Sequence, residues 1–194
     1  PGGQVTRGAG GTAPAGNSPP AVQRRVLGAV KRRAITVVPD SCAGVGPGEI
    51  MLASGARLAC DVPLLALGAQ APGWLAGSGL ALDDAGFLAV NAFQQSTSHT
   101  PVFAAGDVAS RVDAPHPRSG VYAVRAGPAL LTNLRAVLQD QPLVPYTPPT
   151  RTLNLLACGE RYAIASWGGW SFEGRWVWHW KYRIDRTFVA RYAA

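Results

Sequence analysis

An apolar stretch that ends on a Gly-Asp pair constrains the fold of this chain most. Residues 100–109 read Thr-Pro-Val-Phe-Ala-Ala-Gly-Asp-Val-Ala, which predicts a buried strand over 101–107. Open α/β sheets bind ligands at the carboxyl edge of such strands. Gly106 lets a ligand approach the backbone closely, and the ionised carboxylate of Asp107 accepts hydrogen bonds from hydroxyl groups such as those of a ribityl or ribose chain. An Asp in a tight turn is the structural alternative.

A long helix is expected shortly after this motif. Gly120 opens it, and its apolar periodicity continues from 121 to 138. Because the first N–H groups of a helix lack intrahelical partners, they favour negative charge. We expect Val121, Tyr122 and Ala123 to supply those N–H groups to a ligand. An ordinary amphipathic core helix is the alternative.

The remaining segments predict an α/β chain whose C-terminal part is α+β. Residues 1–17 are rich in Gly and Pro and are expected to form a disordered arm or linker. A helix is expected from an N-cap at Ser18 to about Arg33. The other expected elements are a strand at 35–38, a glycine-rich break at 44–48, a hairpin over 50–60, a doubly buried strand at 62–67, strands at 87–90, 152–156 and 162–167, and a helix over 175–192.

Three stretches together carry a family resemblance. Residues 100–109 resemble the second FAD-binding motif of the pyridine nucleotide-disulfide oxidoreductase superfamily, in which the Asp, here Asp107, holds the ribityl hydroxyl of FAD. Residues 66–72 resemble the stretch that returns the chain from the NAD(P)H domain to the FAD domain, with Leu67 in place of the usual Thr. Residues 116–128 resemble the helix that points at the flavin ring.

This resemblance implies FAD as cofactor and NAD(P)H as substrate, with hydride passing from nicotinamide to flavin and on to an acceptor that the residues do not identify. The cofactor does the chemistry, so no catalytic side chain is predicted. The cofactor-binding residues that the resemblance implies are Gly106, Asp107, Gly120, Val121, Tyr122 and Ala123.

Within the superfamily, the chain is similar to the type II NADH dehydrogenase-like branch and to the oxidoreductase domain that also occurs fused to selenide, water dikinase. Residues 120–125, 133–135 and 174–186 carry this similarity. Many type II NADH dehydrogenases have Ala-Gln near the quinone, where this chain has Gly120-Val121, which argues against quinone reduction.

A Gly-x-Gly-x-x-Gly turn, which seats the pyrophosphate of a dinucleotide, does not occur in the sequence. The expected fold is therefore a partial FAD/NAD(P)-binding Rossmann-like domain followed by a small C-terminal α+β domain. Residues 18–67 correspond to a remnant of the NAD(P)H-binding domain, 68–140 to the second half of the FAD-binding domain, and 141–194 to a dimerisation or membrane-surface domain. We expect a C-terminal fragment that is inactive by itself. The alternative is a non-catalytic remnant that acts as an interaction or membrane-surface module.

Five of the six Trp residues follow residue 160. At helical spacing, one face of the terminal segment carries Trp176, Val177, Trp180, Ile184 and Phe188, and another carries Arg175, His179, Arg183 and Arg186. This apolar face could pack on its own domain, contact a second copy of the chain, or lie on a membrane surface. We expect a cytoplasmic location for the protein, which includes a peripheral position on the inner membrane face.

Charge and cysteine content exclude several other classes. The net charge of +7 comes mostly from arginine, but no nucleic-acid-binding motif accompanies it, so no specific nucleic-acid partner is expected. The three widely spaced cysteines do not indicate a disulfide framework or, with the three His, a metal site. The chain contains no run of about 18 apolar residues that could span a membrane.

Overall fold

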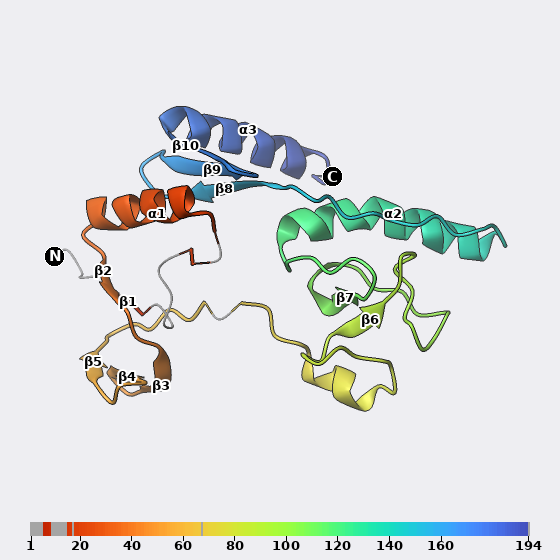
Figure 1. Cartoon of the computed structure of the whole chain (residues 1–194), viewed down its shortest axis with the longest axis horizontal. Coiled ribbons are helices and arrows are strands. Elements are labelled where there is room, and N and C mark those ends of the chain that lie inside the picture. Colours follow the sequence, from red (N-terminus) through yellow and green to blue (C-terminus); the bar gives the residue numbers. More distant parts are fainter. Residues whose placement is uncertain (1–5, 9–14, 17, 67, 194) are drawn as a thin grey trace. The chain divides into compact units, whose positions relative to one another are not determined.

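The computed structural model describes residues 6–8, 15–16, 18–66 and 68–193. The chain divides into two compact units, and each is described here by itself (Figure 1). The terminal unit combines Pro1–Leu65 with Arg151–Ala194, and the central unit is Ala66–Thr150. The sequence predicted domain boundaries after residues 67 and 140 and assigned the extended segment 141–150 to the C-terminal domain. In the structure this segment lies in the central unit. The fold class is α/β, as predicted.

The terminal unit is built around a three-stranded antiparallel sheet in which β9 (Ala163–Trp167) lies between β8 (Leu153–Ala157) and β10 (Trp170–Gly174). Helices α1 (Pro20–Arg32) and α3 (Arg175–Ala190) cover this sheet (Figure 1). Successive side chains of a strand point to opposite faces. Accordingly, Ile164 packs on Val22 of α1, whereas Ala163 packs on Val177 of α3.

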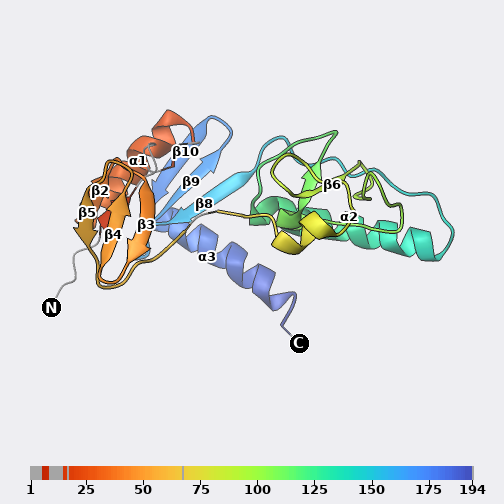
Figure 2. The ribbon, with the colours of Figure 1, turned by 90° about the horizontal axis from the view of Figure 1, so that it is seen from below.

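A second antiparallel sheet of the terminal unit contains β3 (Cys42–Gly46), β4 (Glu49–Leu52) and β5 (Arg57–Ala59) (Figure 2). The hairpin predicted over 50–60 is confirmed as β4 and β5. The predicted break at 44–48 is wrong, because Gly44 and Gly46 belong to β3. Gly44 pairs with Met51, and a Cβ on Gly44 would lie 2.8 Å from the Met51 methyl group. A side chain at this position would therefore have to displace the end of the flexible Met51 side chain.

The prediction of a disordered arm over residues 1–17 is wrong for one short stretch. Thr6–Gly8 form β1, which pairs in parallel with β2 (Thr36–Val38). Composition does not reveal this pairing, because the partner strand lies about thirty residues away and backbone hydrogen bonds do not depend on the side chains. Residues 1–5, 9–14 and 17, to which the prediction of an arm also applied, lie outside the described residues.

The central unit places β6 (Leu88–Val90) parallel to β7 (Ala109–Arg111), with α2 (Gly120–Leu138) beside them (Figure 1). Two short 3₁₀ helices, η1 (Gly73–Gly77) and η2 (Gly106–Val108), lie in the connecting segments. Leu88, Val90 and Ala104 form the buried core. The predicted long helix is confirmed, and its buried face carries Tyr122, Ala126, Asn133 and Ala136.

Two predicted buried strands are not strands in the structure. Residues 62–66 form no strand, and Val62 and Leu64 are 83% and 93% exposed; Leu67, the last residue of that prediction, lies outside the described residues. Residues 101–107 make a single bridge, between Phe103 and Gln95, with hydrogen bonds from the N–H of Ser96 to Val102 and from the N–H of Ala104 to Gln94. An apolar run indicates burial only where a neighbouring strand is present to pair with it.

Other local predictions have mixed outcomes. The strands at 35–38, 87–90, 152–156 and 162–167 and the helices at both ends are confirmed within one or two residues. The sequence missed β10, and the N-cap of α1 is Pro19, not Ser18, whose side chain makes no capping bond. Among the described residues, no helix is long and apolar enough to cross a membrane.

Candidate functional site

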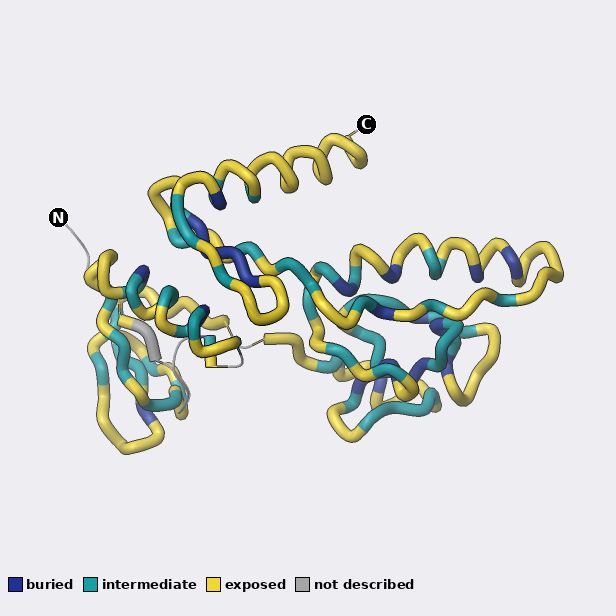
Figure 3. The backbone as a smooth tube through the Cα atoms, turned by 45° about the horizontal axis from the view of Figure 1, so that its top comes forward, coloured by how far each residue is buried: buried dark blue, intermediate teal, exposed yellow. Residues whose placement is uncertain are grey.

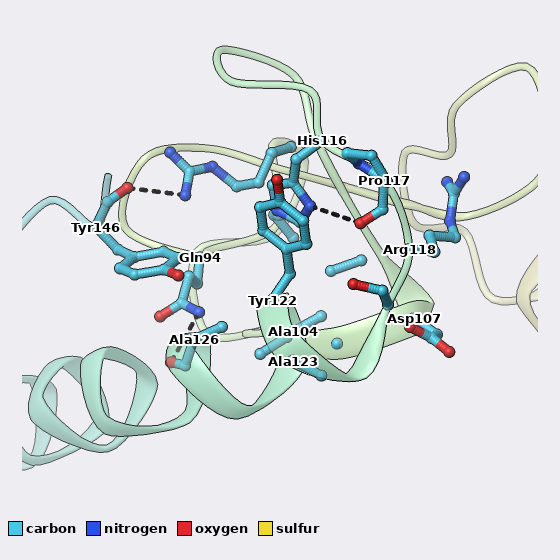
Figure 4. Close-up of a pocket in the computed structure, with 16 residues that line it drawn as sticks. Gln94, Ala104, Asp107, His116, Pro117, Arg118, Tyr122, Ala123, Ala126 and Tyr146 are labelled. Carbon is cyan, nitrogen blue, oxygen red and sulfur yellow. Dashed lines mark hydrogen bonds between the residues drawn. The ribbon is translucent and has the colours of Figure 1, made fainter. Parts of the chain in front are cut away.

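A pocket in the central unit brings most of the predicted site residues together (Figure 4). Its walls are residues 104–107, residues 116–119 and Tyr122, Ala123 and Ala126 of α2, with Gln94, Arg111 and Tyr146 at one end. The predicted site residues Gly120 and Val121 are not among the lining residues. The enclosed space is narrow, about 20 Å³. That volume holds roughly one water molecule, so only an edge of a larger ligand fits inside it.

The Gly-Asp pair forms the turn that begins η2. Gly106 has a φ of +75°, a left-handed conformation that favours glycine, and a Cβ there would lie 3.5 Å from the Cβ of Ala123. Asp107 follows on the exposed rim of the pocket, and no described residue donates a hydrogen bond to its carboxylate. Backbone that a ligand can approach closely therefore lies next to a free acceptor group.

The amino end of α2 forms the adjoining wall, but with fewer free donors than expected. Ser119 is the N-cap residue, and its carbonyl accepts hydrogen bonds from the N–H of Tyr122 (3.0 Å) and of Ala123 (3.2 Å). The prediction that Tyr122 and Ala123 present free N–H groups is therefore wrong, because the first turn tightens onto its own cap. Gly120 and Val121 retain N–H groups without a partner among the described residues.

Side chains of this region line the pocket instead. The Tyr122 ring is buried and stacks on the His116 ring, with 4.3 Å between centroids and 5° between planes. The Arg118 guanidinium lies 3.4 Å from the centroid of the Phe87 ring and 3.1 Å from the Asp83 carboxylate. These contacts fix the segment that leads into α2.

Sequence reasoning missed the polar end of the pocket. Arg111 is buried there and donates two hydrogen bonds of 2.9 Å to Asp113 and one of 2.9 Å to the carbonyl of Tyr146. The hydrogen bond from Arg111 is the largest cause of the lowered pKa of the Asp113 carboxyl. Gln94 is 2% exposed and donates to the carbonyl of Ala126. No linear pattern joins these residues, which lie in segments predicted as loop or extended chain.

Asn133 ties the same region to α2. It is fully buried; its amide nitrogen donates to the carbonyls of Phe93 and Val144, and its oxygen accepts the N–H of Val144. One side chain thus holds both loops that carry Gln94 and Tyr146. In the described part of the chain, no group of three or more His, Cys, Asp or Glu side chains could hold a metal ion.

The fold is that of an α/β protein with a pocket between a Gly-Asp turn and the amino end of a helix. Residues 15–127, more than half of the chain, match the family described as pyridine nucleotide-disulphide oxidoreductase. The chain belongs to this family, as the sequence motifs predicted. No curated protein matches the sequence.

Solved structures show the same fold. A sulfide:quinone oxidoreductase from the hyperthermophilic bacterium Aquifex aeolicus has a TM-score of 0.76 and 16% identity over 96% of this chain and 49% of that chain. Reduced Bacillus anthracis CoADR-RHD has a TM-score of 0.67 and 20% identity over 85% and 30%. An NAD-dependent persulfide reductase from A. fulgidus has a TM-score of 0.65 and 16% identity over 85% and 31%. The chain spans about half or less of these structures.

Proposed function

We propose that this chain forms part of a flavin-dependent oxidoreductase that uses NAD(P)H, and that its pocket holds part of FAD. The observation that carries this proposal is the pocket itself. A free carboxylate at Asp107 and a side-chain-free backbone at Gly106 line one narrow space, and the unpaired N–H groups of Gly120 and Val121 belong to the first turn of α2, whose residues Tyr122 and Ala123 line the same space. When bound, FAD supplies the redox chemistry by taking a hydride equivalent from the nicotinamide.

The residues present suit such a cofactor. Asp107 can only accept hydrogen bonds when ionised, which matches the hydroxyl donors of a ribityl chain. The N–H groups of Gly120 and Val121, at the positive end of the α2 dipole, stabilise negative charge next to them. The stacked rings of His116 and Tyr122 form one wall of the pocket.

The pocket has room for only part of a dinucleotide, which agrees with the lack of a Gly-x-Gly-x-x-Gly turn in this chain. We therefore expect weak, saturable FAD binding and no NAD(P)H oxidation by the chain alone. The electron acceptor and the choice between NADH and NADPH stay open.

A titration of the chain with FAD, followed by flavin fluorescence, tests this proposal. We expect Asp107→Ala to weaken FAD binding about tenfold or more, because a charged acceptor is lost. The matched control is Asp84→Ala, since Asp84 is another exposed aspartate of the central unit that does not line the pocket. Absence of saturable binding by the unaltered chain, or equal affinity of the Asp107→Ala variant, contradicts the proposal.

A second candidate function, an interaction or membrane-surface module, is favoured by an exposed row of aromatic rings on β10 and α3. We define the aromatic row as Trp170, Phe172, Trp176 and Trp180, whose neighbouring centroids are 6.5, 6.0 and 6.4 Å apart. The sequence predicted one apolar face for α3, but Val177 faces the sheet while Trp176 and Trp180 are 56% and 40% exposed.

The charge around this row suits an anionic surface. The segment 175–193 carries one acidic side chain, Asp185, and five basic ones: Arg175, Lys181, Arg183, Arg186 and Arg191. Exposed Trp beside basic residues is typical of helices that lie at a membrane interface. In this second candidate the protein is cytoplasmic and lies on the inner membrane face.

Co-sedimentation with vesicles tests the second candidate. We expect the chain to bind vesicles that contain phosphatidylserine, less at high salt because screening weakens charge attraction, and not vesicles of phosphatidylcholine alone. Sedimentation velocity of the same sample distinguishes a homodimer. If the chain forms a stable dimer and binds neither kind of vesicle, the aromatic row is assigned to a contact between two copies of the chain.

A further inference from the structure

A basic groove lies on α1 in the terminal unit, away from the residues that the proposed function uses. Residues 20–32 include four basic side chains and no acidic one. The groove has a volume of about 310 Å³, and its lining residues are Ala21, Arg24, Arg25, Gly28 and Arg32 of α1 and Glu173 of β10. Three arginines therefore surround one hollow on the helix surface.

Gly28 makes this part of the helix surface hollow. Arg24, Gly28 and Arg32 follow one another at intervals of four residues, so they share one face of α1. Because Gly28 has no side chain, the surface between the two arginines is bare. A Cβ at Gly28 would meet only Nη1 of Arg32, at 3.6 Å. The Arg32 side chain therefore lies back along the helix, toward Gly28.

Arg25 forms a fixed wall of the groove. Its guanidinium donates to a carboxylate oxygen of Glu173 at 2.6 Å, to the Ser171 hydroxyl at 3.1 Å and to the Ser171 carbonyl at 3.3 Å. These bonds use three of the five N–H groups that a guanidinium carries. Two donors of Arg25 are left for a ligand, on a side chain that is already held in place.

Arg24 and Arg32 supply the charge that a ligand can use. Neither makes a hydrogen bond with any residue that the structure describes. The Arg32 guanidinium lies 4.8 Å from the centroid of the Tyr162 ring and 3.9 Å from Oε2 of Glu173. This oxygen is buried, so the carboxylate neutralises one arginine without facing the groove. Two positive charges remain.

We propose that this groove binds the phosphate group of a small molecule, with Arg24 and Arg32 as its charged contacts and Arg25 as a fixed donor. Guanidinium N–H groups match phosphate oxygens in geometry. A phosphate monoester carries nearly two negative charges at neutral pH, which balance the two charges that the groove leaves free. The groove also has the size of a small-molecule site. This inference does not rest on the proposed function, because the FAD pocket is in the other unit.

The groove and the aromatic row lie on opposite faces of the same sheet. Glu173 pairs with Ile164 of β9, which packs on α1. Phe172 contacts Trp176 of α3 edge-on and so lies on the other face. A membrane that binds the aromatic row would not present its headgroup phosphates to the groove. The arrangement therefore favours a soluble phosphate compound over a lipid.

Calorimetric titration with inorganic pyrophosphate at low ionic strength tests the site. We expect saturable binding, with one ion per chain. Arg24→Gln and Arg32→Gln should each weaken binding about tenfold, because charge-assisted hydrogen bonds are lost. Lys31→Gln is the matched control, since it removes the same charge from an exposed position of α1 that does not line the groove. It should leave the affinity nearly unchanged.

Gly28→Leu distinguishes a shaped site from diffuse attraction between charges. The substitution fills the hollow between the arginines and keeps every charge, so pyrophosphate binding should be lost. The variant should fold, because leucine favours a helix more than glycine does and Arg32 is the only neighbour of the added Cβ. An unchanged or higher melting temperature checks this. Asp107→Ala should bind pyrophosphate as the unaltered chain does.

Four results would overturn the inference. The first two are no saturable pyrophosphate binding by the unaltered chain and equal affinity of the Gly28→Leu variant. In the third, a DNA oligonucleotide of random sequence binds more tightly than pyrophosphate, and Gly28→Leu abolishes its binding, which assigns the groove to a nucleic-acid backbone. In the fourth, Gly28→Leu abolishes binding to phosphatidylserine vesicles, which assigns the groove to lipid headgroups.

Discussion

The two units of this protein differ in how many polar side chains they bury. In the central unit the buried polar residues are Gln94, Ser96, Arg111 and Asn133, all at most 6% exposed. In the terminal unit, Trp167, Trp170 and Trp176 are more than half exposed, whereas the buried residues, apart from Ser166, are small and medium apolar ones. Figure 3 colours buried, intermediate and exposed residues along the backbone.

The two candidate binding surfaces, the pocket of the central unit and the aromatic row of the terminal unit, therefore relate differently to the stability of their units. Buried polar groups must be bonded, so the side chains that stabilise the central unit are also those that shape its pocket. In the terminal unit the core around β9 is complete without the aromatic row. Its stability and its exposed surface are therefore expected to respond to different substitutions.

The largest effect is expected for Asn133→Leu in the central unit. The substitution leaves two carbonyls and one N–H without their partner, which should lower the free energy of unfolding by about 4 kcal/mol. Hydrogen exchange should rise in α2 and not in α3. The exposed neighbour Thr132→Ala is the control. A loss below about 1 kcal/mol would mean that the polar network does not stabilise this unit.

Ile164→Ala is the matching change in the terminal unit. Ile164 is fully buried against α1, so its truncation should cost about 3 kcal/mol through lost burial and the cavity left behind. Faster hydrogen exchange should appear in β8 to β10 and α1 only. Leu156→Ala, at the partly exposed position paired with Ile164, should cost much less. Exchange that rises equally in α2 would contradict separate responses of the units.

Protonation of Asp83 at low pH should destabilise the central unit. The expected loss in free energy of unfolding is smaller than the loss caused by Asn133→Leu or Ile164→Ala. Burial raises the pKa of the Asp83 carboxyl, but hydrogen bonds from Ser110, Phe87 and Ala85 and the charge of Arg118 outweigh it and lower the pKa below 3.8. Stability from this group is therefore present above its unfolded pKa and is lost as pH falls through the lower folded value.

The measurement for Asp83 is the melting temperature against pH. Asp83→Asn should flatten the acid side of the curve, whereas Asp84→Asn, at the neighbouring exposed position, should leave it unchanged. An identical acid limb in the Asp83→Asn variant would show that other carboxyl groups cause the loss.

The smallest effect on stability is expected for the aromatic row. Trp176→Ser and Trp180→Ser should each change the free energy of unfolding by about 0.5 kcal/mol or less, because both rings are exposed. Under the second candidate function they should nevertheless reduce vesicle binding. Trp74→Ser removes a Trp of the central unit that is 68% exposed, and it should alter neither quantity. Stability losses as large as that of Ile164→Ala would place the row in the core.

Half of the pocket could be predicted from the sequence. Gly106, Asp107, Tyr122 and Ala123 line it and come from motifs in which each residue's role depends on its immediate neighbours in the chain. The positive φ at Gly106 and the start of α2 are properties of a few consecutive residues. Gln94 and Tyr146 could not be predicted, because Asn133 and Arg111 bring them to the pocket from segments about fifty residues apart.

Sequence by itself determined the long helices, most strands and the family, since periodicity and short motifs are local. Only the tertiary structure decided which apolar runs are buried and which amides are free. Residues 62–66 are exposed, and the N–H groups of Tyr122 and Ala123 are bonded to Ser119. Burial and hydrogen-bond satisfaction depend on what lies alongside in space, and a linear pattern does not contain that information.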